Sequence, residues 1–219
     1  MYSSTGYQCV LTVSDGEVLY RHEGDTMKNI YLIGDSIRYG SKTSTGYEYF
    51  LRQKLSGKAN IFSPNENCRF AQYTLRALYD WVDEVDSAKI DIVHWNNGLW
   101  DVLRMRGDEP LTPLPVYISM LERVFKTIRA MFSNAKIIFA LSTPVIEKNA
   151  PKGWMRYNHE IEEYNLAAAQ LMEKLGVKVN DLYAVAKDFD ESYYADWVHF
   201  NDIGANILAD EIMERLDLA

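Results

Sequence analysis

Residues 29–36 read Asn-Ile-Tyr-Leu-Ile-Gly-Asp-Ser, and this stretch decides the fold class. Four largely apolar residues in a row, closed by a glycine and two polar residues, are typical of a short strand that is covered on both faces and ends in a turn. Such strands belong to parallel sheets. Ser36 would then stand at the carboxyl end of a central strand, where open α/β sheets bind their ligands.

Downstream of this stretch, apolar runs alternate with segments of helical periodicity, which is the pattern of a parallel sheet with crossover helices. We expect strands over residues 29–34, 59–62, 90–95, 136–142 and 177–181. We expect helices over residues 69–85, 116–132, 161–175 and 202–216, the last opened by the capping residue Asn201. The sequence therefore predicts an α/β fold with a central parallel five-stranded sheet.

An additional element precedes this pattern. Residues 9–13 and 18–22 are β-prone and are separated by Ser-Asp-Gly-Glu, which predicts a β-hairpin. We assign residues 1–27 to a hairpin extension and residues 28–219 to one main domain, because no repeat or linker divides them. A ribbon packed on the sheet edge is the favoured interpretation of the hairpin, and a dimer contact or a lid over the site stays open.

Composition excludes several classes of function. A net charge of -8 and a pI near 5.1 argue against a surface that binds nucleic acid. Cys9 and Cys68 lack disulfide or zinc spacing, so both are expected to be reduced, with Cys68 a packed thiol. No histidine pair or carboxylate cluster has the spacing of metal ligands, and we expect no metal and no cofactor.

The ends and apolar runs of the chain bear on its location. The N-terminus lacks the basic start and long apolar run of a secretory signal, and no stretch approaches the length of a membrane span. These features predict a cytoplasmic protein without a membrane partner, or a secreted one if a leader had been removed. The sequence leaves a homo-oligomer open.

A serine nucleophile needs a general base, and one of the four histidines has a suitable neighbour. His199 follows Asp196 by three residues, on a loop between the last strand and the final helix. The Asp196 carboxylate can reach Nδ1 of His199 and leave Nε2 free for the Ser36 hydroxyl. We predict Ser36 as nucleophile, His199 as base and Asp196 as its orienting acid. The other histidines have structural or solvent-facing roles: His22, His94 and His159.

Gly34-Asp35-Ser36 and Asp196-Trp-Val-His199 resemble the first and last sequence blocks of the SGNH (GDSL-like) hydrolases, over about residue 28 to the end. The resemblance implies a flavodoxin-like three-layer sandwich and esterase activity. In that family the serine N–H, a glycine N–H from the second block and an asparagine side chain from the third form the oxyanion hole.

The middle blocks depart from the family pattern. Residues 63–69 read Ser-Pro-Asn-Glu-Asn-Cys-Arg, without a glycine. Residues 95–101 read Trp-Asn-Asn-Gly-Leu-Trp-Asp, with tryptophan where Gly-x-Asn-Asp has asparagine. Asn67 and Asn96 follow the second and third strands, so we expect their amides to supply oxyanion donors, with Asn97 in reserve. Gly98 joins the same oxyanion and substrate-binding set.

Aromatic residues on loops suit sugar rings or flat acyl groups, and no loop carries the aliphatic run that a lipid chain would need. These aromatics are Trp100, Trp154, Tyr193, Tyr194 and Trp197. We expect hydrolysis of a small-molecule or carbohydrate ester through an acyl-enzyme, with a short acyl group such as acetyl. The polar segment 147–158, which contains proline and glycine, suits a substrate-binding or lid loop.

Three alternatives remain at this level. An acyltransferase would use the same triad with another acceptor, and a degenerate SGNH-like binding module would keep the fold without activity. A flavodoxin-like nucleotide or flavin binder is disfavoured, because the first strand-to-helix turn lacks a glycine-rich phosphate loop.

Overall fold

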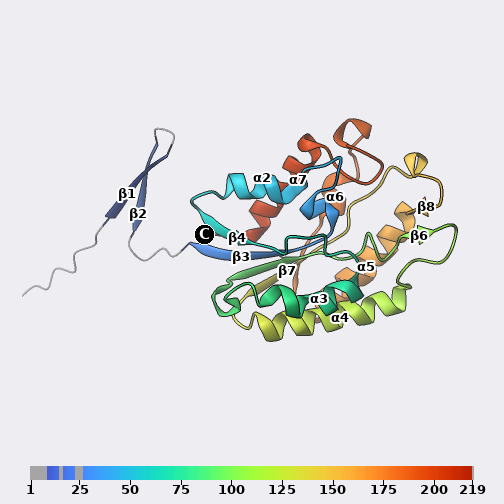
Figure 1. Ribbon diagram of the computed structural model, residues 1–219, viewed down its shortest axis with the longest axis horizontal. Helices are drawn as coiled ribbons and strands as arrows, with labels where there is room; N and C mark the ends of the chain where they lie inside the picture. Colours follow the sequence, from blue (N-terminus) through green and yellow to red (C-terminus); the bar gives the residue numbers. More distant parts are fainter. Residues whose placement is uncertain (1–8, 15–16, 23–26, 219) are drawn as a thin grey trace, which may run out of the picture.

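The computed structural model describes residues 9–14, 17–22 and 27–218 (Figure 1). Strands β1 (Cys9–Ser14) and β2 (Glu17–His22) pair antiparallel, as the predicted hairpin requires. The turn at 15–16 and the connection at 23–26 lie outside the described residues, as do the hairpin side chains. The packing of the hairpin on the sheet edge and the domain division at residue 27 therefore stay predictions.

One parallel sheet organises the rest of the described chain. Its strands are β3 (Lys28–Ile33), β4 (Ala59–Phe62), β5 (Ile92–Trp95), β7 (Lys136–Ala140) and β9 (Lys178–Asn180). They lie in the order β4-β3-β5-β7-β9, with every neighbouring pair parallel. All four residues of β5 are buried, as a central strand covered on both faces should be. The predicted five-stranded parallel sheet is confirmed.

Helices cover both faces of this sheet and make three layers (Figure 1). One face carries α3 (Ala71–Val82), α4 (Leu114–Met131) and α5 (Asn158–Lys174), and the other carries α2 (Tyr47–Lys54), α6 (Leu182–Ala186) and α7 (Asp202–Leu216). Short 3-10 turns are η1 (Ser87–Lys89), η2 (Glu147–Asn149) and η3 (Glu191–Tyr193). Within the described residues, no helix has the length and apolar character needed to cross a bilayer.

Helix α7 begins and ends where the sequence predicts. The Asn201 side chain caps it by accepting the N–H groups of Ile203 at 3.0 Å and Gly204 at 3.2 Å. The predicted strand 59–62 coincides with β4, and the other predicted helices and strands differ from the observed ones by a few residues at their ends. The two-residue strands β6 (Arg104–Met105) and β8 (Trp154–Met155), which pair antiparallel, were not expected. Strand β8 lies inside the segment predicted as a loop.

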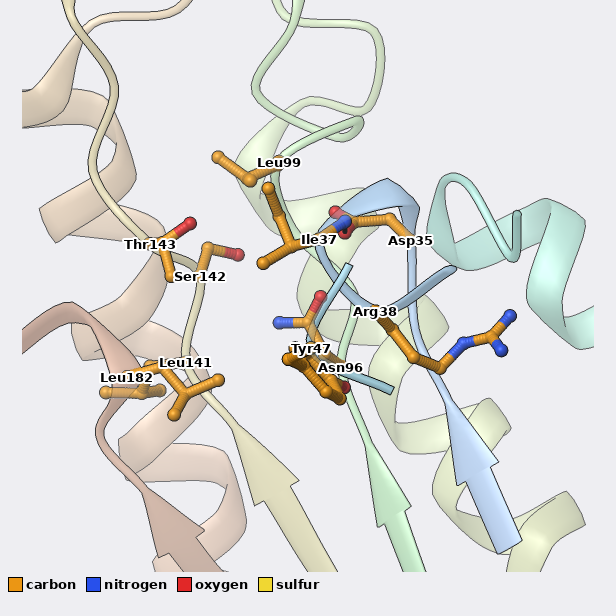
Figure 2. Close-up of a pocket in the computed structure, with 10 residues that line it drawn as sticks. All are labelled: Asp35, Ile37, Arg38, Tyr47, Asn96, Leu99, Leu141, Ser142, Thr143 and Leu182. Carbon is orange, nitrogen blue, oxygen red and sulfur yellow. Dashed lines mark hydrogen bonds between the residues drawn. The ribbon is translucent and has the colours of Figure 1, made fainter. Parts of the chain in front are cut away.

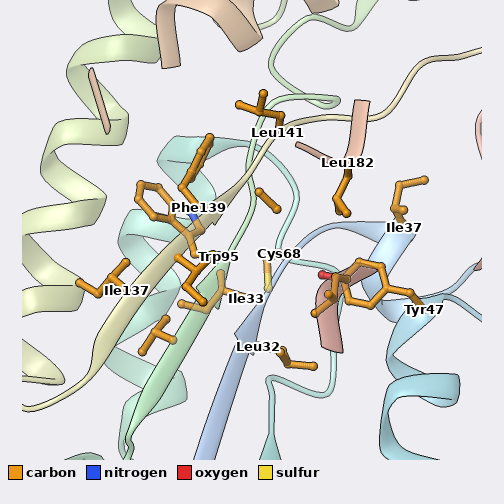
Figure 3. Packing of buried hydrophobic residues seen from close by; sticks show 14 of the residues in the cluster. Leu32, Ile33, Ile37, Tyr47, Cys68, Trp95, Ile137, Phe139, Leu141 and Leu182 are labelled. Carbon is orange, nitrogen blue, oxygen red and sulfur yellow. The ribbon is translucent and has the colours of Figure 1, made fainter. Parts of the chain in front are cut away.

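Apolar side chains from the sheet and from both helical layers form one buried cluster (Figure 3). Cys68 lies within it with no exposed surface, which agrees with its interpretation as a packed thiol. Beside Cys68 lies Arg38, a charged side chain that is only 1% exposed. Its partners span three segments: Gly34 O at 3.2 Å, the Glu48 carboxylate, Pro64 O at 3.3 Å, Glu66 O and Cys68 Sγ at 3.6 Å.

Replacing Arg38 by methionine should lower the free energy of unfolding by about 3–5 kcal/mol, because several buried carbonyls lose their donor and the Glu48 carboxylate loses its buried partner, keeping only Arg52 and Ser63. Urea denaturation measures this change. Arg76→Met is the matched control, since Arg76 pairs with Asp80 at an exposed site and its loss should cost less than about 1 kcal/mol. Equal losses for the two variants would contradict the prediction.

Candidate active site

Ser36 begins the one-turn helix α1 (Ser36–Tyr39) directly after β3, at the carboxyl edge of the sheet. Asp35 caps this turn, with Oδ1 accepting the Ile37 N–H at 2.9 Å. Ser36 itself is 9% exposed. Because α1 is a single turn, its macrodipole is much weaker than that of a long helix, and the local N–H groups are what it presents to a ligand.

A four-residue turn places the predicted base. Asp196 Oδ1 accepts the backbone N–H groups of Val198 and His199, both at 2.8 Å, which bends the chain back on itself. In this bend, His199 Nδ1 lies 2.7 Å from Asp196 Oδ2, and His199 Nε2 lies 2.8 Å from Ser36 Oγ. Ser36, His199 and Asp196 are thus brought into one hydrogen-bonded chain, across a separation of 163 residues between serine and histidine.

Two threonines connect the loop after α1 to the loop that carries His199. Thr43 Oγ1 donates to Asp196 Oδ2 at 2.7 Å, and Thr45 Oγ1 donates to Asp202 Oδ1 at 2.7 Å. The Asp196 carboxylate therefore accepts four hydrogen bonds, two on each oxygen. No spacing or motif in the sequence distinguishes Thr43 or Thr45, so sequence reasoning had no means of finding them.

The hydrogen bonds decide the charge state of Asp196. Partial burial alone would raise its pKa, but the backbone N–H groups of His199 and Val198, the His199 ring and the Thr43 hydroxyl outweigh burial and lower the pKa to about 2. The pKa of Asp35 is instead raised, because full burial outweighs the Ile37 N–H and the nearby Arg156 charge. Asp196 thus stays ionised at neutral pH.

Two of the predicted oxyanion residues keep amide hydrogens available. Asn96 lies directly after β5 and is 8% exposed, and its Nδ2 donates to Ala140 O at 2.8 Å, which uses one of two hydrogens. Asn67 uses its Oδ1 to accept the Arg69 N–H at 2.8 Å, and its Nδ2 has no partner among the described residues. Cys68 N donates to Gly34 O at 3.1 Å, which holds the Asn67 loop beside the end of β3.

The other two residues of that set, Asn97 and Gly98, have structural roles. Asn97 is fully buried and all its amide groups are engaged, with Trp95 Nε1, Arg69 O and Thr74 Oγ1, so it cannot act as a reserve donor without breaking them. Gly98 has a φ of +151°, and a Cβ there would lie 2.2 Å from Ser142 Oγ. Gly98 therefore allows the loop after β5 to approach the loop after β7.

A small cavity lies between the loops that follow β3, β5 and β7, and it is lined by both chain neighbours of Ser36, Asp35 and Ile37, but not by Ser36 itself (Figure 2). Its volume of about 10 Å³ suits one group of the size of a water molecule or a methyl. The cavity is lined by Asp35, Ile37, Arg38, Tyr47, Asn96, Leu99, Leu141, Ser142, Thr143 and Leu182. The hydroxyls of Tyr47, Ser142 and Thr143 are buried and have no hydrogen-bond partner in the described part of the chain, which leaves them available to a ligand.

The sequence matches a known protein family over most of its length. A model of the GDSL-like lipase/acylhydrolase family matches residues 32–207, a span that contains Ser36, Asp196 and His199. The chain belongs to this family. The match confirms the family resemblance drawn from the first and last blocks, and a GDSL-like chain of this kind is a carboxylic ester hydrolase.

Individual relatives of this GDSL-like hydrolase are distant. The GDSL esterase/lipase CPRD49 of Arabidopsis thaliana is 25% identical over 214 residues, covering 87% of this chain and 79% of the relative. Among the solved structures that share the fold is a lipase/acylhydrolase from Enterococcus faecalis, with 18% identity, a TM-score of 0.67, and coverage of 87% of this chain and 95% of that one. Another is a Clostridium thermocellum family 3 carbohydrate esterase, with 15% identity, a TM-score of 0.63, and coverage of 86% of this chain and 94% of that one.

The described residues of this GDSL-like hydrolase contain no group of three or more histidine, cysteine, aspartate or glutamate side chains placed to hold a metal ion. His94 is fully buried in β5, and burial lowers its pKa to about 4, so it is a neutral core residue. His159 lies in the first turn of α5, and the side chain of His22 lies outside the described residues.

Replacing Thr43 by valine should raise the pKa of Asp196 from about 2 towards its ordinary value of 3.8, because one hydrogen bond to the ionised form is lost. A carboxyl-carbon NMR titration measures it. The stabilisation from Asp196 ionisation is present above pH 3.8 and is lost as pH falls towards 2. In the variant the loss should begin at the same pH, since the unfolded state is unchanged, but it should be smaller and end at a higher pH.

Ser41→Ala is the control for this titration, because Ser41 contacts Thr43 at 2.9 Å but does not touch Asp196. An unchanged pKa of Asp196 in Thr43→Val would show that the threonine hydroxyl contributes nothing to the carboxylate.

Proposed function

We propose that this protein is a serine esterase that removes a short acyl group from an alcohol, with Ser36 as nucleophile, His199 as general base and acid, and Asp196 as the residue that orients His199. The single observation that carries the proposal is the continuous chain from Ser36 Oγ through His199 to Asp196, with hydrogen bonds of 2.8 and 2.7 Å. Such a chain supplies both the base and the orienting group that a serine hydroxyl needs.

Acylation begins when Ser36 Oγ attacks the ester carbonyl carbon and passes its proton to His199 Nε2. The tetrahedral intermediate collapses as the bond to the alcohol oxygen breaks, and His199 gives the proton to that oxygen. The imidazolium formed in between is stabilised by Asp196, whose depressed pKa keeps it ionised. The result is an acyl-Ser36 ester and a free alcohol.

Deacylation repeats these steps with water. A water molecule gives a proton to His199 Nε2 and its oxygen bonds the acyl carbon, after which Ser36 Oγ leaves and recovers the proton. The products are the carboxylic acid and the resting enzyme. An oxyanion forms in both halves, and we assign its stabilisation to the Ser36 N–H with the Asn67 and Asn96 amides.

The size of the cavity beside Ser36 supports a short acyl group. We assign the acyl methyl to this cavity because Asp35 and Ile37, on either side of Ser36, line it, and its volume of about 10 Å³ suits a group no larger than a methyl. Ile37, Leu99 and Leu141 bound it, so a longer aliphatic chain would have to displace buried side chains. The acyl group that fits with least rearrangement is acetyl.

A carbohydrate is our proposed source of the alcohol, on the strength of two tryptophans. Trp154 is 44% exposed, and Trp197 belongs to the turn between Asp196 and His199. The tyrosines of the same predicted set pack against the core instead, since Tyr193 stacks on Phe189 at 4.4 Å and Tyr194 packs on Phe200 at 4.6 Å. The indole of Trp197, in the turn of the base, and the exposed indole of Trp154 each offer a flat face that suits a sugar ring.

Ser36→Ala and His199→Ala should each abolish the turnover of p-nitrophenyl acetate, because each removes a group that makes or breaks a bond. The wild type should gain one adduct mass from a fluorophosphonate probe, and Ser36→Ala should gain none. Intact-mass spectrometry and absorbance at the nitrophenolate band measure both. With p-nitrophenyl octanoate in place of the acetate, wild-type kcat/KM should fall by about tenfold or more, since bulky additions to a packed cavity cost 1–3 kcal/mol.

Ser192→Ala is a matched control, because Ser192 is an exposed hydroxyl that contacts Asp190 and should leave turnover unchanged. A folded wild-type protein that neither labels nor turns over the acetate would contradict the proposal and favour a degenerate binding module. Transfer of the acetyl group to a sugar hydroxyl faster than to water would favour an acyltransferase instead.

Asn67→Ala and Asn96→Ala should each lower kcat by a factor of about 10²–10³ with little change in KM, the usual effect of removing one oxyanion donor. Asn60→Ala is the control, since Asn60 Nδ2 contacts Asn29 at 2.8 Å on the edge strand β4. Steady-state kinetics with p-nitrophenyl acetate measure the effect. If only one of the two variants loses kcat, the other asparagine has a structural role alone.

A further inference from the structure

Arg156 is a second buried arginine, and it lies between the cavity and the loop of the base. It follows β8 and precedes α5, and it is 6% exposed. Its Nε donates to the carbonyl of Leu99, a residue that lines the cavity beside Ser36. Its guanidinium carbon lies 5.2 Å from the ring centroid of Trp197, between Asp196 and His199. Arg156 is therefore held by one contact to a residue that lines the cavity and one to a residue in the turn of the base.

The binding capacity of this guanidinium is mostly unused. In the described part of the chain, no carboxylate lies within ion-pairing distance of Arg156, and its two terminal nitrogens have no hydrogen-bond partner. Unlike Asp35 Oδ2, those nitrogens keep some exposed surface, which accounts for part of the 6% of Arg156 that is exposed. Arg38, the other buried arginine, is paired with Glu48 and four backbone or sulfur acceptors.

Arg156 nevertheless keeps its charge. Burial lowers its pKa to about 10, against the raising influence of Asp35 and Asp196, and that value still leaves it protonated at neutral pH. A buried cation without a paired anion destabilises the folded state, whereas a ligand anion would relieve the cost. The two terminal nitrogens form the fork that binds a carboxylate through parallel hydrogen bonds.

The position of Arg156 indicates which part of the ester it faces. It is not among the residues that line the acyl cavity, and Leu99 lies between it and that cavity. Its other neighbour, Trp197, lines an open hollow of about 400 Å³ together with Ile146, Tyr194 and Asp196. Arg156 does not line this hollow either, and Glu191 does; Arg156 contacts one residue of each space, Leu99 of the cavity and Trp197 of the hollow. An ester with its acyl group in the cavity and its alcohol part directed towards the hollow would therefore pass beside Arg156.

We propose that Arg156 is a specificity-determining residue that binds a carboxylate on the alcohol part of the substrate, so that the enzyme prefers acyl esters of acidic alcohols such as hydroxy acids or acidic sugars. This inference rests on the proposed esterase function and narrows its substrate class. A carboxylate fits better than a phosphate dianion, because one guanidinium beside Asp35 and Asp196 supplies too little positive charge for two negative ones.

The test compares esters that differ only in one charge: 3- and 4-acetoxybenzoate, each against its methyl ester. For Arg156→Gln, the ratio of kcat/KM for the acid over that for the methyl ester should fall by about tenfold or more in at least one pair, mainly through KM. The difference in leaving group within a pair cancels when wild type and variant are compared. Arg156→Lys, which keeps the charge without the fork, should lose less.

Arg123→Gln is the charge-matched control, because it removes one positive charge from an exposed position on α4 and should leave both ratios unchanged. Thermal unfolding checks that Arg156→Gln is folded. For wild type alone, benzoate should inhibit hydrolysis of the methyl esters competitively, and benzamide, which has the same shape without the charge, should not.

The outcomes separate the two levels of the proposal. A wild type that hydrolyses none of the four esters overturns the esterase function. A wild type that hydrolyses the methyl esters, with both ratios changed by less than about threefold in Arg156→Gln and with no inhibition by benzoate, overturns the role of Arg156 alone. If Arg156→Gln does not fold, inhibition by benzoate but not by benzamide decides the matter.

Discussion

The ion pair and hydrogen bonds of Arg38 are the constraint on which the arrangement of the site depends. One guanidinium joins the end of β3 to α2 and to the loop after β4, three segments that are distant from one another in sequence. Because the group is removed from water, it is stable only while all its acceptors are present. The turn that carries Ser36 is thereby held against the loop that carries Asn67. A charged residue in the core thus takes part in positioning the chemistry.

Much of the fold was predictable because its decisive signals are local. The apolar run at 30–33 is buried on both faces, and Asn201 caps α7 through hydrogen bonds within three residues. The Asp196–His199 pair was predictable for the same reason, since one turn of chain forms it. That Ser36 lies beside this pair followed from parallel topology, which brings the carboxyl ends of the strands to one edge.

What the sequence did not predict depends on contacts between distant segments. Thr43 lies in a polar loop, and only its distance of 2.7 Å from Asp196 Oδ2 distinguishes it. Arg156 lies in a segment that we interpreted as a lid or binding loop, where two-residue strands leave no periodicity to detect. The engagement of Asn97 by Trp95, Arg69 and Thr74 was equally invisible, because it requires three segments to meet.

The two threonine contacts have a consequence for thermal motion. Thr43 and Thr45 attach the segment after Ser36 to residues on both sides of His199: Asp196, which begins the turn, and Asp202, the first residue of α7. A displacement of either loop is therefore shared by the other, and the separation of nucleophile and base changes less than the position of each. Fluctuations that would otherwise broaden the distribution of that distance become rigid-body movements of the pair. Reactive geometry can thus persist although Ser36 and His199 themselves lie in a single turn and a loop, because these segments are attached to each other and to the first residue of α7.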